Sequence, residues 1–144
     1  MPLSFKAWTE ALIASRERWL ATNPPASGSN VAMTRDIGLP VMRSVLAFHR
    51  AQFAEVVSHL HPIRHRIHEF GGSHAQRDAV YKTLLEATLR SGQFALANVL
   101  ASERIAVRPR SPYNWFKHAE ALEGLGQHTR AALARVTAQQ RTSD

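Results

Sequence analysis

The amino-acid sequence predicts an all-α protein of about seven helices, arranged as antiparallel helix-turn-helix pairs. Apolar residues recur at spacings of three and four through most of the chain, as on a helix with one buried face. Alanine, with 22 residues, and leucine, with 14, are the commonest types, and both favour closely packed helices. Short turns rich in Gly, Pro and Ser separate the patterns, so neighbouring helices should run antiparallel.

The first predicted helix runs from residue 4 to about residue 22, with Ser4 as its expected N-cap. A Pro-, Gly- and Ser-rich linker follows, so residues 1–34 are predicted to be a helix and linker preceding a domain at 35–140. This helix has no partner helix of its own. We therefore expect it to cap the helical array or to form a homodimer through its apolar face. Its large apolar residues are Phe5, Trp8, Leu12, Ile13, Trp19 and Leu20.

A second helix is expected to begin near Arg35 or Asp36, with Pro40 in its first turn, where a missing N–H costs nothing. The third begins near Phe53, and Pro62 predicts a kink or break within it. Its apolar pattern resumes as far as Phe70 and then meets a pair of glycines.

The remaining helices have recognisable starts and ends. Ser73 and Gln76 have the spacing of a capping box, which opens a helix that ends at Ser91-Gly92. The next helix runs from Phe94 to the residues before Pro109. Ser111 with Pro112 opens the sixth, and a frayed last helix covers residues 131–138 after two glycine turns.

The turns also repeat in sequence. Gly92-Gln93-Phe94 corresponds to Gly126-Gln127-His128, an offset of 34 residues, which is the period of the tetratricopeptide repeat. An earlier copy, Ala51-Gln52-Phe53, precedes the first by 41 residues. Three repeats are therefore predicted, at about 37–72, 78–111 and 112–140, stacked as a short right-handed solenoid of this type.

Three blocks of sequence resemble a known family. They are Arg35-Asp36-Ile37-Gly38-Leu39-Pro40, Pro62-Ile63-Arg64-His65-Arg66-Ile67 and Gly71-Gly72-Ser73-His74-Ala75-Gln76-Arg77-Asp78. Over roughly residues 35–126 the chain resembles the C-terminal part of tetratricopeptide repeat protein 38 and its bacterial relatives. That resemblance implies an all-helical repeat scaffold with no assigned reaction.

Repeat arrays of this type usually hold peptides against the first helix of each repeat. In this alignment the expected partner-binding groove mixes apolar and charged side chains, and it lacks the asparagines of a chaperone-tail clamp. Its residues are Phe48, His49, Lys82, Glu86, Arg90, Tyr113, Phe116 and Glu120.

The family block could instead carry a ligand site, since Ser73, His74, Gln76, Arg77 and Asp78 lie within six residues. Structural roles are preferred, because Ser73 and Gln76 suit a helix cap and Asp78 is expected in the positive first turn. Arg77 and His74 would then contact the preceding segment or a ligand. A pocket joining His74, Arg77 and a carboxylate such as Asp36 would be needed for an enzyme, and we expect none.

Histidines crowd the region before this block, and His61, His65 and His68 would share one face of a continuous helix. Such a face could bind zinc, nickel or copper, but Pro62 and the neighbouring arginines oppose it, so we expect no metal and no cofactor.

The formal charge of +7 raises a second function, nucleic-acid binding. The excess is spread along the chain, with its best local patch at Arg104, Arg108 and Arg110, so this stays the alternative. We expect a cytoplasmic, non-enzymatic interaction scaffold that binds a protein or peptide, without a membrane segment.

Overall fold

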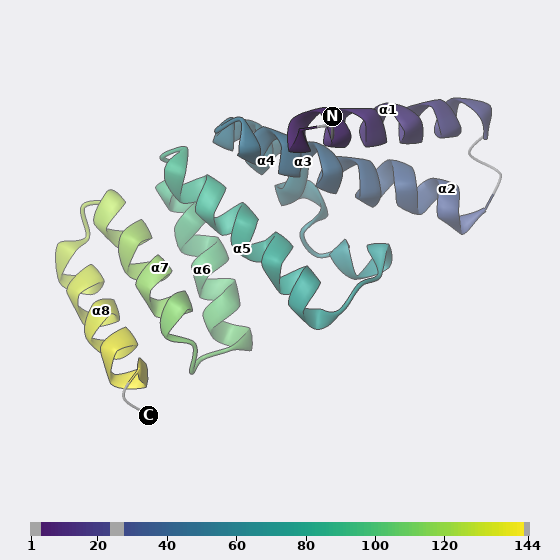
Figure 1. The fold of residues 1–144 in the computed structure, drawn as a ribbon. Coiled ribbons are helices and arrows are strands. Elements are labelled where there is room, and N and C mark those ends of the chain that lie inside the picture. Colours follow the sequence, from purple (N-terminus) through teal and green to yellow (C-terminus); the bar gives the residue numbers. More distant parts are fainter. Residues whose placement is uncertain (1–3, 24–27, 143–144) are drawn as a thin grey trace. The chain divides into compact units, whose positions relative to one another are not determined.

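The computed structural model describes residues 4–23 and 28–142, and within them the chain is all-α, as predicted. If α2, a π-helical segment (Thr34–Gly38) and α3 are taken as one continuous helix, these residues form seven helices. Figure 1 shows them as α1 (Phe5–Thr22), α2 (Ser29–Met33), α3 (Leu39–His49), α4 (Phe53–Leu60), α5 (His74–Arg90), α6 (Phe94–Val107), α7 (Pro112–Gly124) and α8 (His128–Thr142).

The chain divides into two compact units, Met1–Leu84 and Leu85–Asp144, so the division falls within α5. Each unit has its own packing and is described by itself. The expected domain boundary after residue 34 and the limits of the three repeats stay predictions.

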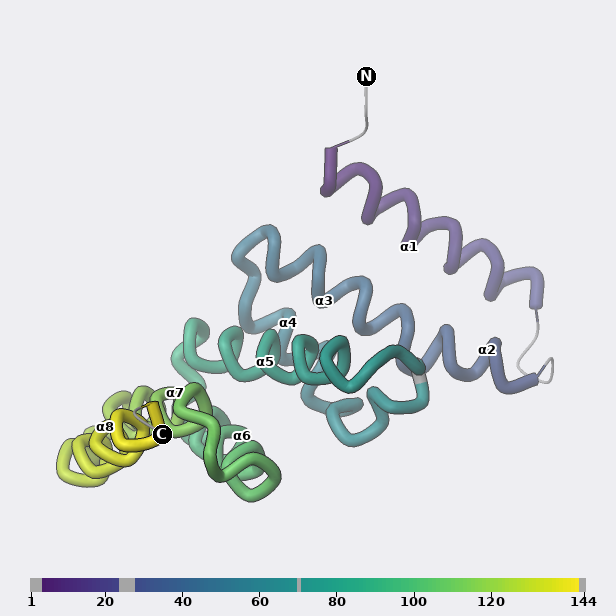
Figure 2. Tube along the Cα trace, turned by 60° about the horizontal axis from the view of Figure 1, so that its bottom comes forward, coloured from purple at the N-terminus to yellow at the C-terminus, as the bar shows by residue number. Residues whose placement is uncertain are grey.

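In the first unit, α1 packs against α3 in the antiparallel sense (Figure 2). The direction is also evident from two ion pairs, because Glu17 pairs with Arg43 at 2.6 Å whereas Glu10, earlier in α1, pairs with the later Arg50. Between the helices, Ile13 of α1 packs with Leu39 and Leu46 of α3. The expected N-cap is confirmed, since the Ser4 hydroxyl accepts a hydrogen bond from the Ala7 N–H at 3.2 Å.

The second helix begins earlier than predicted. The structure begins it at Ser29 and continues it through the π-helical segment into α3, so the expected start near Arg35 is wrong. In the wider π turn the Leu39 N–H donates to the carbonyl of Thr34, five residues earlier. This wider turn comes immediately before Pro40, whose ring would clash with an ordinary α-helical turn. Pro40 therefore lies within a continuous helix.

Pro62 breaks the third helix as predicted. α4 ends at Leu60, and a 3₁₀ turn follows at His61–Ile63. The α-helix expected to resume as far as Phe70 is wrong, since the structure has a second 3₁₀ turn at Ile67–Phe70. Proline has no N–H to continue the α-helical ladder, and Ile63 and Ile67 remain buried through tighter turns.

Three helix hairpins, α3–α4, α5–α6 and α7–α8, are closed by turns of the same geometry. Each turn has one residue in the left-handed conformation: Ala51 (φ 57°), Gly92 (φ 74°) and Gly126 (φ 73°). In each, the next residue is a glutamine whose N–H closes a Schellman motif on a carbonyl five residues earlier. The bonds are Gln52 to Ala47 at 2.8 Å, Gln93 to Thr88 at 3.0 Å and Gln127 to Leu122 at 2.9 Å. The repeat of turns read from the sequence is therefore confirmed.

In the second unit, α7 packs against both α6 and α8. Small residues allow the approach of α7 and α8, where Ala119, Leu122, Ala131 and Ala134 form a buried cluster covered by Trp115. At the end of α7, Gly124 lies directly against the Phe94 ring, and an added Cβ would lie 2.3 Å from two ring carbons.

We predict that Gly124→Ala destabilises the protein by about 1–3 kcal/mol, because the methyl group would overlap the Phe94 ring. Without that overlap, alanine in a helix would be about 1 kcal/mol more favourable than glycine, so the sign of the change is diagnostic. Urea unfolding measures it, and Gly124→Ala combined with Phe94→Ala is the control, in which the added methyl group should no longer destabilise. A stabilising Gly124→Ala single variant would contradict the close approach.

Candidate functional site

A cluster of charged side chains connects the end of α5 to α7 within the second unit. Glu86 is its centre: its carboxylate is 2.7 Å from the Lys117 ammonium and 3.7 Å from the Arg90 guanidinium. The Tyr113 hydroxyl donates a long hydrogen bond of 3.4 Å to Glu86, and Lys117 also contacts Glu120 at 3.0 Å. The cluster is a continuous network of alternating charge.

Helical periodicity brings these residues together. On α7, Tyr113, Lys117 and Glu120 follow one another at spacings of four and three, which places them on one face. On α5, Glu86 and Arg90 are four residues apart and share a face in the same way.

The network is partly removed from water, and its pKa values reflect this. Burial raises the pKa of Tyr113 to about 12, with a further contribution from the Glu86 carboxylate. Burial opposes the charged form of Lys117, but the carboxylates of Glu86 and Glu120 outweigh it and raise the lysine pKa. Both side chains therefore keep their protons at neutral pH, Tyr113 as a hydrogen-bond donor and Lys117 as a cation.

A buried pair supports the start of α7. Asn114 is fully buried, and its Oδ1 accepts a hydrogen bond of 2.9 Å from Nε of Arg104 on α6. The Asn114 amide donates to the carbonyls of Arg104 and Arg108, each at 3.2 Å, and so satisfies the C-terminal end of α6. The Arg104 guanidinium also lies 5.7 Å from the centre of the Tyr113 ring. This pair holds Tyr113 in place within the network.

The network forms an accessible surface, which we call the α5–α7 surface and define by Glu86, Arg90, Tyr113, Phe116, Lys117 and Glu120. The Arg90 and Glu120 side chains are 53% and 49% exposed, and Phe116 is 38% exposed. A partner would therefore meet the Arg90 cation on α5, and the Phe116 ring and the Glu120 carboxylate one turn apart on α7.

Of the groove residues predicted from the sequence, Glu86, Arg90, Tyr113 and Glu120 are joined by this network, and Phe116 lies beside them on α7. The other three belong to the first unit. Phe48 packs edge-on against Phe53, with ring centres 5.3 Å apart, and the exposed His49 ring lies 5.2 Å from that of Phe5. Lys82 pairs with Asp78 at 3.3 Å.

Sequence reasoning missed Lys117, which is the cation that joins Glu86 to Glu120. The available signal was its spacing, four residues after Tyr113 and three before Glu120. The patch expected at Arg104, Arg108 and Arg110 needs a correction, because Arg104 is only 7% exposed and bonds Asn114.

The family block at the start of α5 forms local contacts. The capping box is confirmed, with the Ser73 N–H donating to Gln76 Oε1 at 2.8 Å and the Gln76 N–H donating to Ser73 Oγ at 3.2 Å. Arg77 donates to the Gly72 carbonyl at 3.3 Å and lies 3.0 Å from His74 Nδ1. Asp78 falls after the first turn of α5, so the role expected for it there is wrong, and it pairs with Lys82 instead.

The structure does not place His61, His65 and His68 on one face of a continuous helix, so that expectation is wrong. Because α4 ends at Leu60, His61 lies in a 3₁₀ turn, and His65 and His68 do not continue its helix. Within the part of the chain that the structure describes, no three side chains of metal-binding type come together. Asp36, the carboxylate considered for an enzyme, pairs with Arg35 at 2.7 Å, which lowers the Asp36 pKa.

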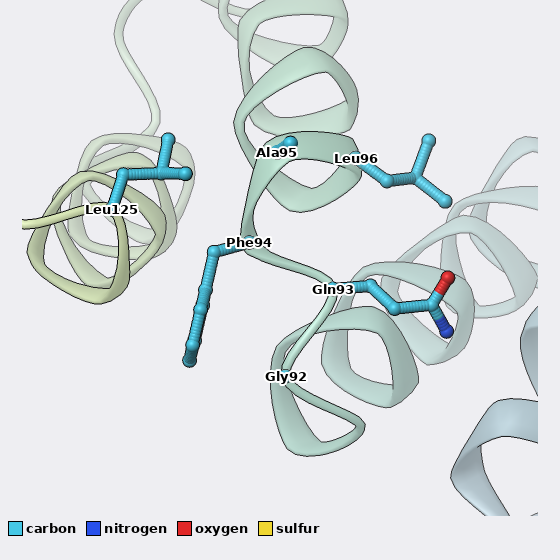
Figure 3. A pocket seen from close by; sticks show the side chains of 6 residues that line it. All are labelled: Gly92, Gln93, Phe94, Ala95, Leu96 and Leu125. Carbon is cyan, nitrogen blue, oxygen red and sulfur yellow. The ribbon is translucent and has the colours of Figure 1, made fainter.

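A pocket of about 430 Å³ opens near the turn between α5 and α6 (Figure 3). The Phe94 ring points to the side of Leu125, whereas Gln93 and Leu96 point the opposite way. None of its lining residues is titratable; they are Gly92, Gln93, Phe94, Ala95, Leu96 and Leu125. The lining of the pocket is largely apolar, and its side chains supply no acid or base.

Comparison with known proteins adds no assignment: no family model matches this chain, and no solved structure matches it. Among the helices at residues 4–23 and 28–142, none has the length and apolar character needed to cross a membrane.

We predict that Asn114→Ala costs about 2–4 kcal/mol of unfolding free energy, because it removes the hydrogen bond from Arg104 Nε and the two that the Asn114 amide donates to the carbonyls of Arg104 and Arg108. The matched control is Asn98→Ala on α6, where the side-chain oxygen is buried without a hydrogen-bond partner. That change removes a buried oxygen that accepts no hydrogen bond, so it should cost at least about 1 kcal/mol less than Asn114→Ala. Equal losses for the two variants in urea unfolding would contradict the role given to Asn114.

Proposed function

We propose that this protein is a non-enzymatic interaction scaffold of the tetratricopeptide-repeat type, acting in the cytoplasm. The proposal rests on three hairpin turns with the same left-handed position and the same glutamine hydrogen bond. Two of the turns are 34 residues apart in sequence, the period of that repeat. Buried alanines at 97 and 101 in α6 and at 131 and 134 in α8 agree with the close helix packing of such repeats.

The binding surface in this proposal is the α5–α7 surface, and its occupant is a peptide segment of a partner protein. The observation that carries the proposal is the Glu86–Lys117–Glu120 network, which is held by ion pairs of 2.7 and 3.0 Å. A network already ordered in the unbound protein loses little side-chain entropy on binding. The exposed Phe116 ring supplies apolar area beside the charges.

The chemistry of the described residues favours binding over catalysis. The pocket near Phe94 is lined by side chains that cannot exchange protons, and the carboxylates of Glu86 and Glu120 are held by Lys117. The nucleic-acid alternative is weakened because Arg104 belongs to the interior and not to an exposed basic patch.

Affinity capture from the native cell with the full chain as bait, followed by mass spectrometry, identifies the partner. The affinity of the chain for this partner should fall at least tenfold when Arg90→Ala and Phe116→Ala are combined, since both side chains belong to the exposed part of the α5–α7 surface. The matched control combines Arg110→Ala with Val99→Ala, two exposed residues outside the surface, and should bind as the parent does. Equal binding by the two double variants would contradict this use of the surface.

A further inference from the structure

Helix α1 carries an apolar stripe on its surface. Phe5, Trp8, Leu12, Ser15 and Trp19 follow one another at alternating spacings of three and four, which is the heptad pattern of a helix-helix seam, with Ser15 as its one polar member. Trp8 is 55% exposed, and Phe5 is 51% exposed although its ring lies 5.2 Å from the His49 ring of α3.

The side of α1 next to the stripe is committed to α3. Thr9 and Ile13 are buried, and Glu10 and Glu17 pair with Arg50 and Arg43 of α3. The two ion pairs are one heptad apart, and together with the buried Thr9 and Ile13 they show which side of α1 faces α3. The stripe therefore cannot turn inward without breaking both pairs and exposing Ile13.

The charges around the stripe have one sign. Both carboxylates of α1 are occupied by α3 arginines, whereas Lys6, Arg16 and Arg18 are exposed. Within the described residues these three cations form no ion pair. In the heptad defined by the stripe, Arg16 and Arg18 occupy the positions that flank the seam and select its partner by charge.

From this placement we infer that α1 is the docking site for an acidic amphipathic helix of a partner protein. Its apolar face packs on Phe5, Trp8 and Leu12, and its carboxylates pair with Arg16 and Arg18. The stripe has the narrow width of a helix seam, which favours a helix over the broader apolar face that inserts into a membrane surface.

A second copy of the chain is the less favourable occupant. An antiparallel pair of α1 helices would bring flanks carrying Arg16 and Arg18 together, and the carboxylates of both copies already serve α3. The homodimer expected from the sequence uses the same stripe, so it competes directly with this proposal.

The test uses the full chain and two labelled synthetic helical peptides. Both have Leu and Ile at the seam positions of three heptads, but one has Glu and the other Lys at the flanking positions. By fluorescence anisotropy, the Glu peptide should bind saturably and at least tenfold more tightly than the Lys peptide. Arg16→Glu with Arg18→Glu should reverse that preference, and Trp8→Ala should weaken Glu-peptide binding at least tenfold.

Matched controls test specificity. Arg110→Glu with Arg130→Glu makes the same change of charge on exposed residues of the second unit, and Leu133→Ala removes an apolar side chain that is 64% exposed on α8. Both should bind the Glu peptide as the parent does. The Arg90→Ala/Phe116→Ala variant should also bind the Glu peptide as the parent does. The two proposals, on α1 and on the α5–α7 surface, are therefore tested independently.

Three results would overturn the inference. The first is no binding of the Glu peptide, or equal binding of the two peptides. The second is a dimer in analytical ultracentrifugation that Trp8→Ala dissociates and the Glu peptide does not. The third is Trp8-dependent binding to vesicles of anionic and neutral phospholipid by a chain that ignores the Glu peptide.

Discussion

The structure depends on how a helix can reverse direction within two residues. After the last turn of α3, α5 and α7, the chain takes one left-handed residue and then donates a backbone N–H to a carbonyl five residues earlier. Glycine adopts that conformation readily, and Gly92 and Gly126 occupy two of the three positions. Because the turn is so short, α4 returns against α3 and α8 returns against α7. Small residues such as Ala131 and Ala134 allow the close approach of α7 and α8.

Hydrogen bonds within the second unit position the side chains of the candidate site. The Asn114 amide closes the end of α6 and at the same time fixes the start of α7, where Tyr113 and Lys117 project towards Glu86. A residue that stabilises the fold thus also positions the binding network. In the first unit the burial of Ile13 against Leu39 and Leu46 has a comparable double effect, since it holds α1 on α3 and leaves Trp8 of the apolar stripe exposed.

Features encoded over a few residues could be predicted from the sequence. The Ser4 cap, the box formed by Ser73 and Gln76, and the three equivalent turns each depend on neighbours in the chain. Features that depend on distant partners could not. From its sequence context Arg104 is expected to be a surface cation. It is buried because α7 brings Asn114 against it. The histidine face was predicted wrongly for a related reason. Its spacing of four and three residues assumes one continuous helix past Pro62, whereas α4 ends at Leu60.

The equivalence of the three turns is the central claim, and unfolding free energies test it most directly. Gly92→Ala and Gly126→Ala should each cost about 1 kcal/mol, because both place a side chain at positive φ. Ala51→Gly should instead stabilise by ~0.5 kcal/mol, since it relieves the same strain where the turn already carries alanine at φ 57°. Opposite signs are the predicted result. A destabilising Ala51→Gly, with Gly92→Ala and Gly126→Ala neutral, would show that the turns are not equivalent.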